Sequence, residues 1–326
     1  MRDWLTHGEQ APAVLVTVAR VEGSVPREPG ARMLVRRDSF DGTIGGGHLE
    51  HRALDIARAM LEDGRGPCLE RFPLGPSLGQ CCGGIAWLAF EPADDSQLAL
   101  LAARRDEDSW RVVALDGQAQ WGLVDAQGRL LAGQAGPAFS LEGETRVIEE
   151  GGRRWLVDAV RAPRAHLVLF GAGHVGAAIV RALAELPCRV TWVDQREDLF
   201  PAEVPPNVRL EATDTPEALV DSAPPGASFL VMTHSHALDL RLAHAILSRP
   251  AGDWFGLIGS ETKRRQFEHR LRERGILEAR LADMVCPIGL PGIAGKAPAV
   301  IAASCAAQLL TVWEAAAHPD LSSESN

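Results

Sequence analysis

The chain has 326 residues, of which 46% are hydrophobic and 23% are charged, and its formal net charge at pH 7 is −10. This length favours two domains over one, and the composition is ordinary for a globular chain that buries a core. The acidic balance argues against a nucleic-acid-binding protein, whose surface would be basic.

The beginning of the chain lacks the apolar core of a signal peptide. No apolar run in the sequence approaches the roughly 18 residues that a membrane span needs. Six cysteines without framework spacing are typical of a reducing compartment. We therefore expect a cytoplasmic protein that binds neither nucleic acid nor membrane.

Short apolar strands separated by glycine-rich turns make up the first 90 residues. Strands are predicted at 14–18, 33–35 and 85–90, because each is an apolar run bounded by turn residues. A helix is predicted over 48–63, since its apolar residues recur at helical spacing and Gly64 follows as a stop.

Three consecutive glycines precede that helix: Gly45, Gly46 and Gly47. Exposed backbone N–H groups and the positive end of the helix dipole favour an anion at such a terminus. Arg27 and Arg32 are expected nearby, where they would add positive charge. Glu50 lies in the first turn and is equally suited to cap the helix.

A cysteine pair, Cys81 and Cys82, stands in a glycine-rich turn and is followed by Gly83 and Gly84. A thiolate is a soft ligand for thiophilic metal centres, and glycine lets a bulky ligand approach the backbone. The other cysteines are scattered singly, which excludes a zinc finger. The residues alone leave two interpretations open, a functional thiol pair or two buried, inert cysteines.

The middle and the second half of the chain differ in pattern. Residues 110–160 are predicted to form an antiparallel β-meander, with glycine-containing turns between alternating strands. From residue 166 onward, strands without polar alternation are separated by helices, as in a parallel sheet covered on both faces.

The predicted fold class is therefore α/β, with a C-terminal doubly wound (Rossmann-like) parallel sheet and a smaller N-terminal α+β domain. We place the N-terminal domain at 1–162, the Rossmann-like domain at 163–318 and a disordered tail at 319–326.

A dinucleotide-binding fingerprint opens the second domain. Its candidate cofactor-binding residues are Gly171, Gly173, His174, Gly176 and Asp194. The glycines allow a tight turn and close helix packing, and the acid is placed to accept from a ribose hydroxyl. NAD(P) is thus a candidate cofactor, although a fold does not dictate its ligand. Arg196 would either bind a phosphate or simply be exposed to solvent.

Polar residues follow two further strands of the predicted sheet. His234 and His236, with Asp239 behind them, offer ligands for a divalent metal, but loop residues two apart do not obviously converge. Positioning of a ligand by the histidines is the alternative. Ser260 begins a helix with Lys263 one turn on, which suits either an anion or an ordinary N-cap.

Taken in order, these motifs resemble the XdhC/CoxI family, whose XdhC-type members are accessory proteins of xanthine dehydrogenase. The segments that carry the resemblance are GSVPREPGARM (23–33), GTIGGGHLE (42–50), LGPSLGQCCGG (74–84), LFGAGHVG (169–176), VDQR (193–196), MTHSHALD (232–239), GLIGSETK (256–263) and CPIGLPG (286–292). They lie in both domains, whereas 91–165 carries no family motif.

The resemblance implies a molybdenum cofactor chaperone rather than an enzyme. Such a carrier holds molybdopterin-bound molybdenum while its terminal sulfur is installed and then delivers it to apo xanthine dehydrogenase. A cysteine desulfurase and a second copy of the chain, forming a homodimer, are the further expected partners. Cys82 is the expected metal ligand, with Cys81 beside it, because it directly precedes the paired glycines.

Three other functions stay open. The fingerprint favours an NAD(P)-dependent oxidoreductase, but the chain has no tyrosine, which removes one common catalytic design. A scaffold would dock a desulfurase through the basic stretch 263–274, whose default interpretation is a solvated helix face. A metal-dependent hydrolase would use His234, His236 and Asp239, although no general base is evident.

Overall fold

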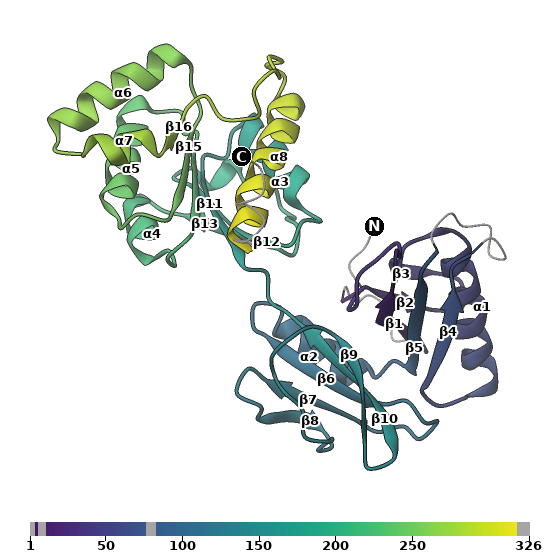
Figure 1. Ribbon diagram of the computed structural model, residues 1–326. Coiled ribbons are helices and arrows are strands. Elements are labelled where there is room, and N and C mark those ends of the chain that lie inside the picture. The colour runs from purple at the N-terminus through teal and green to yellow at the C-terminus, as the bar shows by residue number, and fades with distance from the viewer. Residues whose placement is uncertain (1–3, 6–10, 76–82, 318–326) are drawn as a thin grey trace. The chain divides into compact units, whose positions relative to one another are not determined.

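The computed structural model describes residues 4–5, 11–75 and 83–317 and divides into two compact units, Met1–Ala162 and Pro163–Asn326 (Figure 1). The cysteine pair Cys81 and Cys82 and the predicted tail 319–326 lie outside the described residues. Each unit has its own hydrophobic clusters.

The first unit begins with a five-stranded antiparallel sheet. Its strands in spatial order are β3 (Phe40–Gly42), β2 (Arg32–Val35), β1 (Val14–Glu22), β5 (Ile85–Pro92) and β4 (Cys68–Pro73). Helix α1 (Gly47–Asp63) covers one face, where Val16 and Val18 pack with its Leu49. Leu15 and Ala19 belong to clusters on the opposite face. Burial on both faces explains why β1 is apolar from Val14 to Ala19 apart from Thr17.

A second antiparallel sheet completes this unit. Its strands in spatial order are β8 (Leu130–Gly133), β7 (Trp121–Asp125), β6 (Ser109–Ala114), β10 (Arg153–Val160) and β9 (Arg146–Glu150). The predicted hairpins are confirmed, with positive φ at Gly151 and Gly152 between β9 and β10. The order of a simple meander is wrong, because β10 pairs with the fully buried β6, which needs a neighbour on each side.

The two sheets of the first unit pack against each other. Ala19 and Ala89 of the first sheet form a buried cluster with Val113, Leu115 and Leu156 of the segment that carries the second sheet. Helix α2 (Asp95–Ala103), capped by the Asp94 carboxylate, adds its apolar side chains to a neighbouring cluster. The N-terminal domain is thus a two-sheet unit.

A charged cluster is buried beside this interface. Asp158 of β10 accepts hydrogen bonds from Arg32 Nε at 3.0 Å and Nη2 at 2.5 Å, and from Arg111 Nη1 at 2.7 Å. Arg111 also pairs with Glu91 of β5, and the Arg111 side chain is fully buried. Arg32 was expected near the triple glycine; its guanidinium is instead committed to this cluster.

The second unit contains a six-stranded parallel sheet. Its strands in spatial order are β13 (Val208–Ala212), β12 (Cys188–Asp194), β11 (Ala165–Phe170), β14 (Ser228–Val231), β15 (Trp254–Leu257) and β16 (Met284–Val285). Counted within the unit, this is the order 3-2-1-4-5-6 of a Rossmann fold, which confirms the predicted fold class. The first three strands are added toward one edge of the sheet and the last three toward the other, so β11 and β14 flank the topological switch point.

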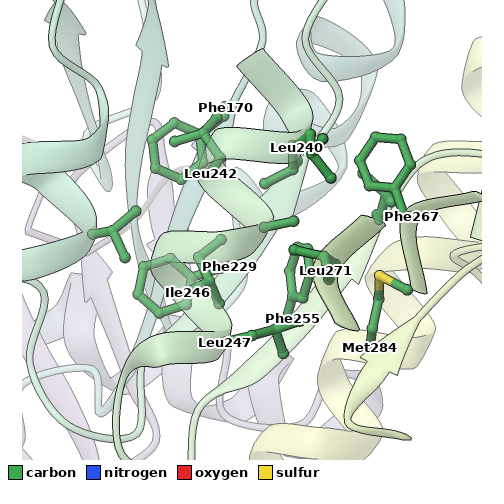
Figure 2. Packing of buried hydrophobic residues seen from close by; sticks show 14 of the residues in the cluster. Phe170, Phe229, Leu240, Leu242, Ile246, Leu247, Phe255, Phe267, Leu271 and Met284 are labelled. Atoms are coloured by element: carbon green, nitrogen blue, oxygen red, sulfur yellow. The ribbon is translucent and has the colours of Figure 1, made fainter. Parts of the chain in front are cut away.

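Helices cover both faces of the parallel sheet, as the unbroken apolar strands predicted. The helices of this unit are α3 (His174–Leu183), the short 3₁₀ helix η2 (Glu197–Leu199), α4 (Glu217–Ser222), α5 (His236–Ser248), α6 (Glu261–Glu273), α7 (Glu278–Ala282) and α8 (Pro298–Ala317). Helices α3 and α8 share one cluster with Leu169 and Trp192. Figure 2 shows the cluster on the other face, where Phe170, Phe229 and Phe255 of the strands meet side chains of α5 and α6.

Helix α8 corrects one expectation from the sequence. It has 20 residues, and an 18-residue window of it has a mean hydropathy of 1.5, so by length and composition it could cross a membrane; 28% of that window is buried in the structure. In this unit it packs against α3, and its Ala302, Cys305 and Leu309 are buried. Length and composition alone therefore do not distinguish a core helix from a membrane span.

Candidate functional site

The glycine fingerprint lies at the carboxyl edge of the parallel sheet, between β11 and α3. Gly171 has a φ of +122°, a value that favours glycine. A Cβ atom on Gly176 would lie 2.1 Å from the Gly171 carbonyl oxygen, so this position admits only glycine without a backbone shift. A Cβ on Gly173, the N-cap of α3, would meet no atom within 4 Å, which leaves room for a ligand beside His174.

Asp194 ends β12 and is bound to that loop. Its Oδ2 accepts from the Ala172 backbone N–H at 2.7 Å and from Arg196 Nη2 at 3.0 Å, while Oδ1 accepts from the backbone N–H and Nε of Arg196 at 3.0 and 2.9 Å. Burial raises the pKa of Asp194, but the Arg196 and Ala172 hydrogen bonds outweigh it and lower the pKa overall. The fingerprint predicted that this carboxylate accepts a hydrogen bond from a ribose hydroxyl. In the structure its oxygens already accept hydrogen bonds from Ala172 and Arg196.

A hollow adjoins this acid at the same edge of the sheet. Its lining comes from the ends of β11 and β12, the loop after β14, and helices on that face. The lining residues are Phe170, Val193, Asp194, Gln195, Pro216, Thr233, His234, Leu238 and Leu242. The hollow has a volume of only about 10 Å³, room for about one water molecule, and its apolar side chains belong to the buried core of this unit. Of the two predicted histidines, His234 lines the hollow, whereas the His236 ring lies edge-on to Phe267.

The loop after β14 is held by a buried ion pair. Lys263 Nζ donates to Asp239 Oδ2 at 2.7 Å and to the Ile258 carbonyl at 2.8 Å. Asp239 Oδ1 in turn accepts from the Thr233 hydroxyl and backbone N–H, at 2.7 and 3.1 Å. Lys263 therefore fixes the loop rather than offering a free cation, and Ser260 is the N-cap of α6.

The metal-dependent hydrolase is not supported. Among the residues that the structure describes, no three His, Cys, Asp or Glu side chains form a group able to hold a metal ion. Asp239, the expected carboxylate ligand, is fully buried and paired with Lys263.

The scaffold alternative depended on the basic stretch 263–274, most of which lies in α6. The positive charge of this helix is partly neutralised, since Arg264 pairs with Glu268.

Three loops of the first unit gather at one end of its first sheet. Gly84, the C-terminal stem of the cysteine loop, lies so close to the 23–30 loop that its Cβ would be 2.3 Å from the Ser24 carbonyl oxygen. Leu74, the other stem residue, donates its N–H to the Gly84 carbonyl. A Cβ on Gly45 would in turn lie 2.5 Å from Pro26 Cβ. Segments far apart in the sequence are thus neighbours here.

The triple glycine leads into α1 as predicted, but a side chain of the protein occupies part of the anion site. Glu50 Oε2 accepts from the Ile44 and Gly46 backbone N–H groups at 3.3 and 3.2 Å and from the Thr43 hydroxyl at 2.7 Å. Gly46, the N-cap, supplies no side-chain cap, so the next N–H groups, from Gly47 on, are the ones left for an anion.

Two glycines at this end have no close neighbours among the described residues. Added Cβ atoms on Gly46 and on Gly83 would meet none of the described atoms within 4 Å. Arg27, whose side chain is 38% exposed, pairs with Glu28 and lies against Gly45. The arrangement therefore brings backbone amides, one arginine and the stem of the cysteine loop to the same end of the sheet.

The four described cysteines are not candidates for a reactive thiol. Burial raises the pKa of Cys188 and of Cys286 to about 11 and that of Cys305 to about 12. Burial also raises the pKa of Cys68, which is half-buried on β4. Cys81 and Cys82 lie outside the described residues, so their role stays a prediction.

The fold and these sites define a two-unit α/β protein with a Rossmann domain at its C-terminal end. The family model described as XdhC Rossmann domain matches residues 167–309, and the model described as XdhC and CoxI family matches residues 7–73. The chain belongs to the XdhC and CoxI family.

Two relatives illustrate the match. The uncharacterized protein YqeB of Escherichia coli (strain K12) is 31% identical over 306 residues, which cover 93% of this chain and 44% of that protein. The chain thus spans less than half the length of this curated relative. A crystal structure described as a xanthine dehydrogenase from Bacillus halodurans matches with a TM-score of 0.71 at 21% identity, covering 94% of this chain and 93% of that one. At this identity the second match establishes the fold.

Proposed function

We propose that this chain is an accessory protein for the maturation of xanthine dehydrogenase, and that its first unit binds the molybdenum cofactor. The observation that carries the proposal is the gathering of the 23–30 loop, the triple glycine and the stem of the cysteine loop at one end of the first sheet. These are the family motifs of this unit, and the chain belongs to the XdhC and CoxI family.

The residues present suit a molybdopterin. Its phosphate would be held at the α1 N-terminus that follows Gly45, Gly46 and Gly47. The Gly45 and Gly46 N–H groups donate to Thr43 and Glu50, so the N–H groups from Gly47 on are the ones proposed to bind it. Arg27 adds positive charge beside them. When bound, the cofactor supplies a soft molybdenum–sulfur centre, for which the Cys82 thiolate, with Cys81 and Gly83 beside it, is the appropriate ligand type.

Partners follow from the same proposal. The carrier would hold the cofactor during sulfuration by a cysteine desulfurase and deliver it to apo xanthine dehydrogenase, acting as a homodimer in the cytoplasm. On this proposal the protein itself is not an enzyme.

The test is cofactor analysis of the full chain purified from cells that make molybdopterin. We expect molybdenum and pterin to copurify with the wild type, and Cys82→Ala to lose most of the molybdenum. Cys68→Ala removes a thiol of the same unit from β4 and should keep the wild-type content. Equal molybdenum in all three proteins, or none in the wild type, would reject the proposal.

A further inference from the structure

We propose that three residues on the first sheet, Arg20, Trp87 and Arg71, form the docking surface for an acidic segment of the enzyme that receives the cofactor. The inference rests on the proposed function, because it requires a carrier that hands its cofactor to a client enzyme. It adds the place on this chain where the client binds and the chemistry that recognises it. We call the three residues the arginine–tryptophan cluster.

Strand pairing brings the three side chains together. Trp87 of β5 lies directly opposite Arg20 of β1 on one side and Arg71 of β4 on the other. Its neighbours Ala86 and Leu88 pack in the hydrophobic cluster that contains α1, so alternation along the strand turns Trp87 to the opposite face. The guanidinium carbons of Arg20 and Arg71 lie 4.8 and 5.7 Å from the centre of the Trp87 ring. Both cations are thus held against the same aromatic side chain.

The cluster is accessible and positively charged. The Arg20 side chain is 59% exposed, Arg71 is exposed and Trp87 is half-buried. Arg20 pairs with Glu22, so two guanidinium groups face one carboxylate, in a chain whose net charge is −10. Since β4 is the last strand on its side of the sheet, the cluster reaches the edge of the sheet. The complementary partner surface is acidic.

The residue types are those of a binding surface. Tryptophan and arginine are enriched among the residues that dominate the binding energy of protein interfaces. An arginine stacked on an aromatic ring keeps N–H groups for a carboxylate and has less side-chain freedom to lose on binding. Carboxylates of the partner would bind the two guanidinium groups, while an apolar side chain between them would cover the exposed part of Trp87. The occupant is therefore an acidic segment that carries a hydrophobic residue.

The cluster lies next to the loops that are proposed to hold the cofactor. β5 begins directly after Gly84, so at about 3.3 Å per residue Trp87 is about 10 Å from this stem of the cysteine loop. On β1, Glu22 pairs with Ile85, and a Cβ on Gly23 would lie 3.3 Å from Gly84 Cα. The same two strands carry the cluster and lead into the loops. A client bound to the cluster would thus lie beside the cofactor that it receives, which is why we assign the surface to the client.

Titration calorimetry of the full chain with apo xanthine dehydrogenase tests the proposal. The double variant Arg20→Glu, Arg71→Glu should bind at least about tenfold more weakly than the wild type, because two attractive contacts become repulsive. Glu22→Gln removes the carboxylate that competes for Arg20 and should bind more tightly. Added salt should weaken the wild type more than the double variant, since exposed charge pairs are screened.

The matched control is Arg65→Glu. Arg65 is 54% exposed and pairs with Asp63 as Arg20 pairs with Glu22, but it precedes β4, at the opposite end of that strand from the cysteine loop. This variant should bind the client like the wild type. The double variant should keep the molybdenum content of the wild type, because its arginines lie outside the proposed cofactor site.

Four results would overturn the proposal: no binding of the client by the wild type, equal weakening by Arg65→Glu, loss of molybdenum from the double variant, or loss of binding to the cysteine desulfurase instead of the client. The two proposals fail separately. Unchanged client binding by a molybdenum-loaded double variant would reject this surface alone. A wild type that lacks molybdenum but binds the client through the cluster would reject the cofactor role and support the surface.

Discussion

The charged cluster of the first unit gives the sharpest stability prediction. Replacing Asp158 by Asn keeps the shape of the side chain but removes the carboxylate charge that forms ion pairs with both Arg32 and Arg111. Four donors converge on this carboxylate, including the Thr145 hydroxyl at 2.8 Å, and the side chain is fully buried. The amide group of Asn would point two further donors at them.

The expected cost is about 3–5 kcal/mol of unfolding free energy, the usual result of removing one partner from a buried ion pair. The comparison is Glu91→Gln in the same cluster. Burial raises the pKa of Glu91 despite its pairing with Arg111, so its charge is less favourable in the folded state and its removal should cost less. Glu211→Gln, in an exposed pair, should cost at most about 1 kcal/mol.

The pH dependence provides an independent check. Burial raises the pKa of Asp158, but the charges and hydrogen bonds of Arg32 and Arg111 outweigh it, and the pKa is lowered overall. Since the folded pKa is below the unfolded value of about 3.9, this contribution is complete at neutral pH and is lost as the pH falls through the folded pKa. The gap between wild type and Asp158→Asn should therefore narrow below about pH 4.

The assay is hydrogen exchange of the full chain followed by mass spectrometry, which resolves the two units. Peptides from β6 and β10 should exchange faster in Asp158→Asn, whereas peptides from β11 and β12 act as an internal reference. A loss under about 1 kcal/mol in the first unit, or a loss equal to that of Glu91→Gln, would refute the reasoning.

Three further predictions use the second unit. Gly176→Ala forces a Cβ against the Gly171 carbonyl and should lower the stability of this unit by at least about 1–3 kcal/mol in urea unfolding, whereas Gly173→Ala, with open space around it, should not; equal midpoints would contradict the geometry. Lys263→Met leaves the buried Asp239 without its cation and should cost about 3–5 kcal/mol, a reading that fails if thermal unfolding is unchanged. The three buried cysteines, whose pKa values burial raises to about 11 or 12, should resist iodoacetamide at pH 8 in the native protein and react only after denaturation, as mass spectrometry would show.

One ion pair seen in the structure was weakly indicated by the sequence, and the others were not indicated at all. Asp194 and Arg196 stand two residues apart at a strand end, a spacing at which a side chain can turn back onto its neighbour, and this was available from the sequence. Asp239 and Lys263 are 24 residues apart, and Arg111 and Asp158 are 47 apart. Nothing in local patterning selects these partners among the many charges of the chain, because each pair forms only where separate elements meet.

The sequence by itself determined the elements and their chemistry. Unbroken apolar strands predict a sheet covered on both faces, and the spacing of Gly171, Gly176 and Asp194 predicts a Rossmann turn, since both depend on local backbone geometry. The gathering of the N-terminal motifs, the place of β10 beside β6, and the state of Asp194 were decided by tertiary structure. Hydrogen-bond capacity is shared between neighbours in space, so whether an acid is free for a ligand depends on which donors the fold brings to it.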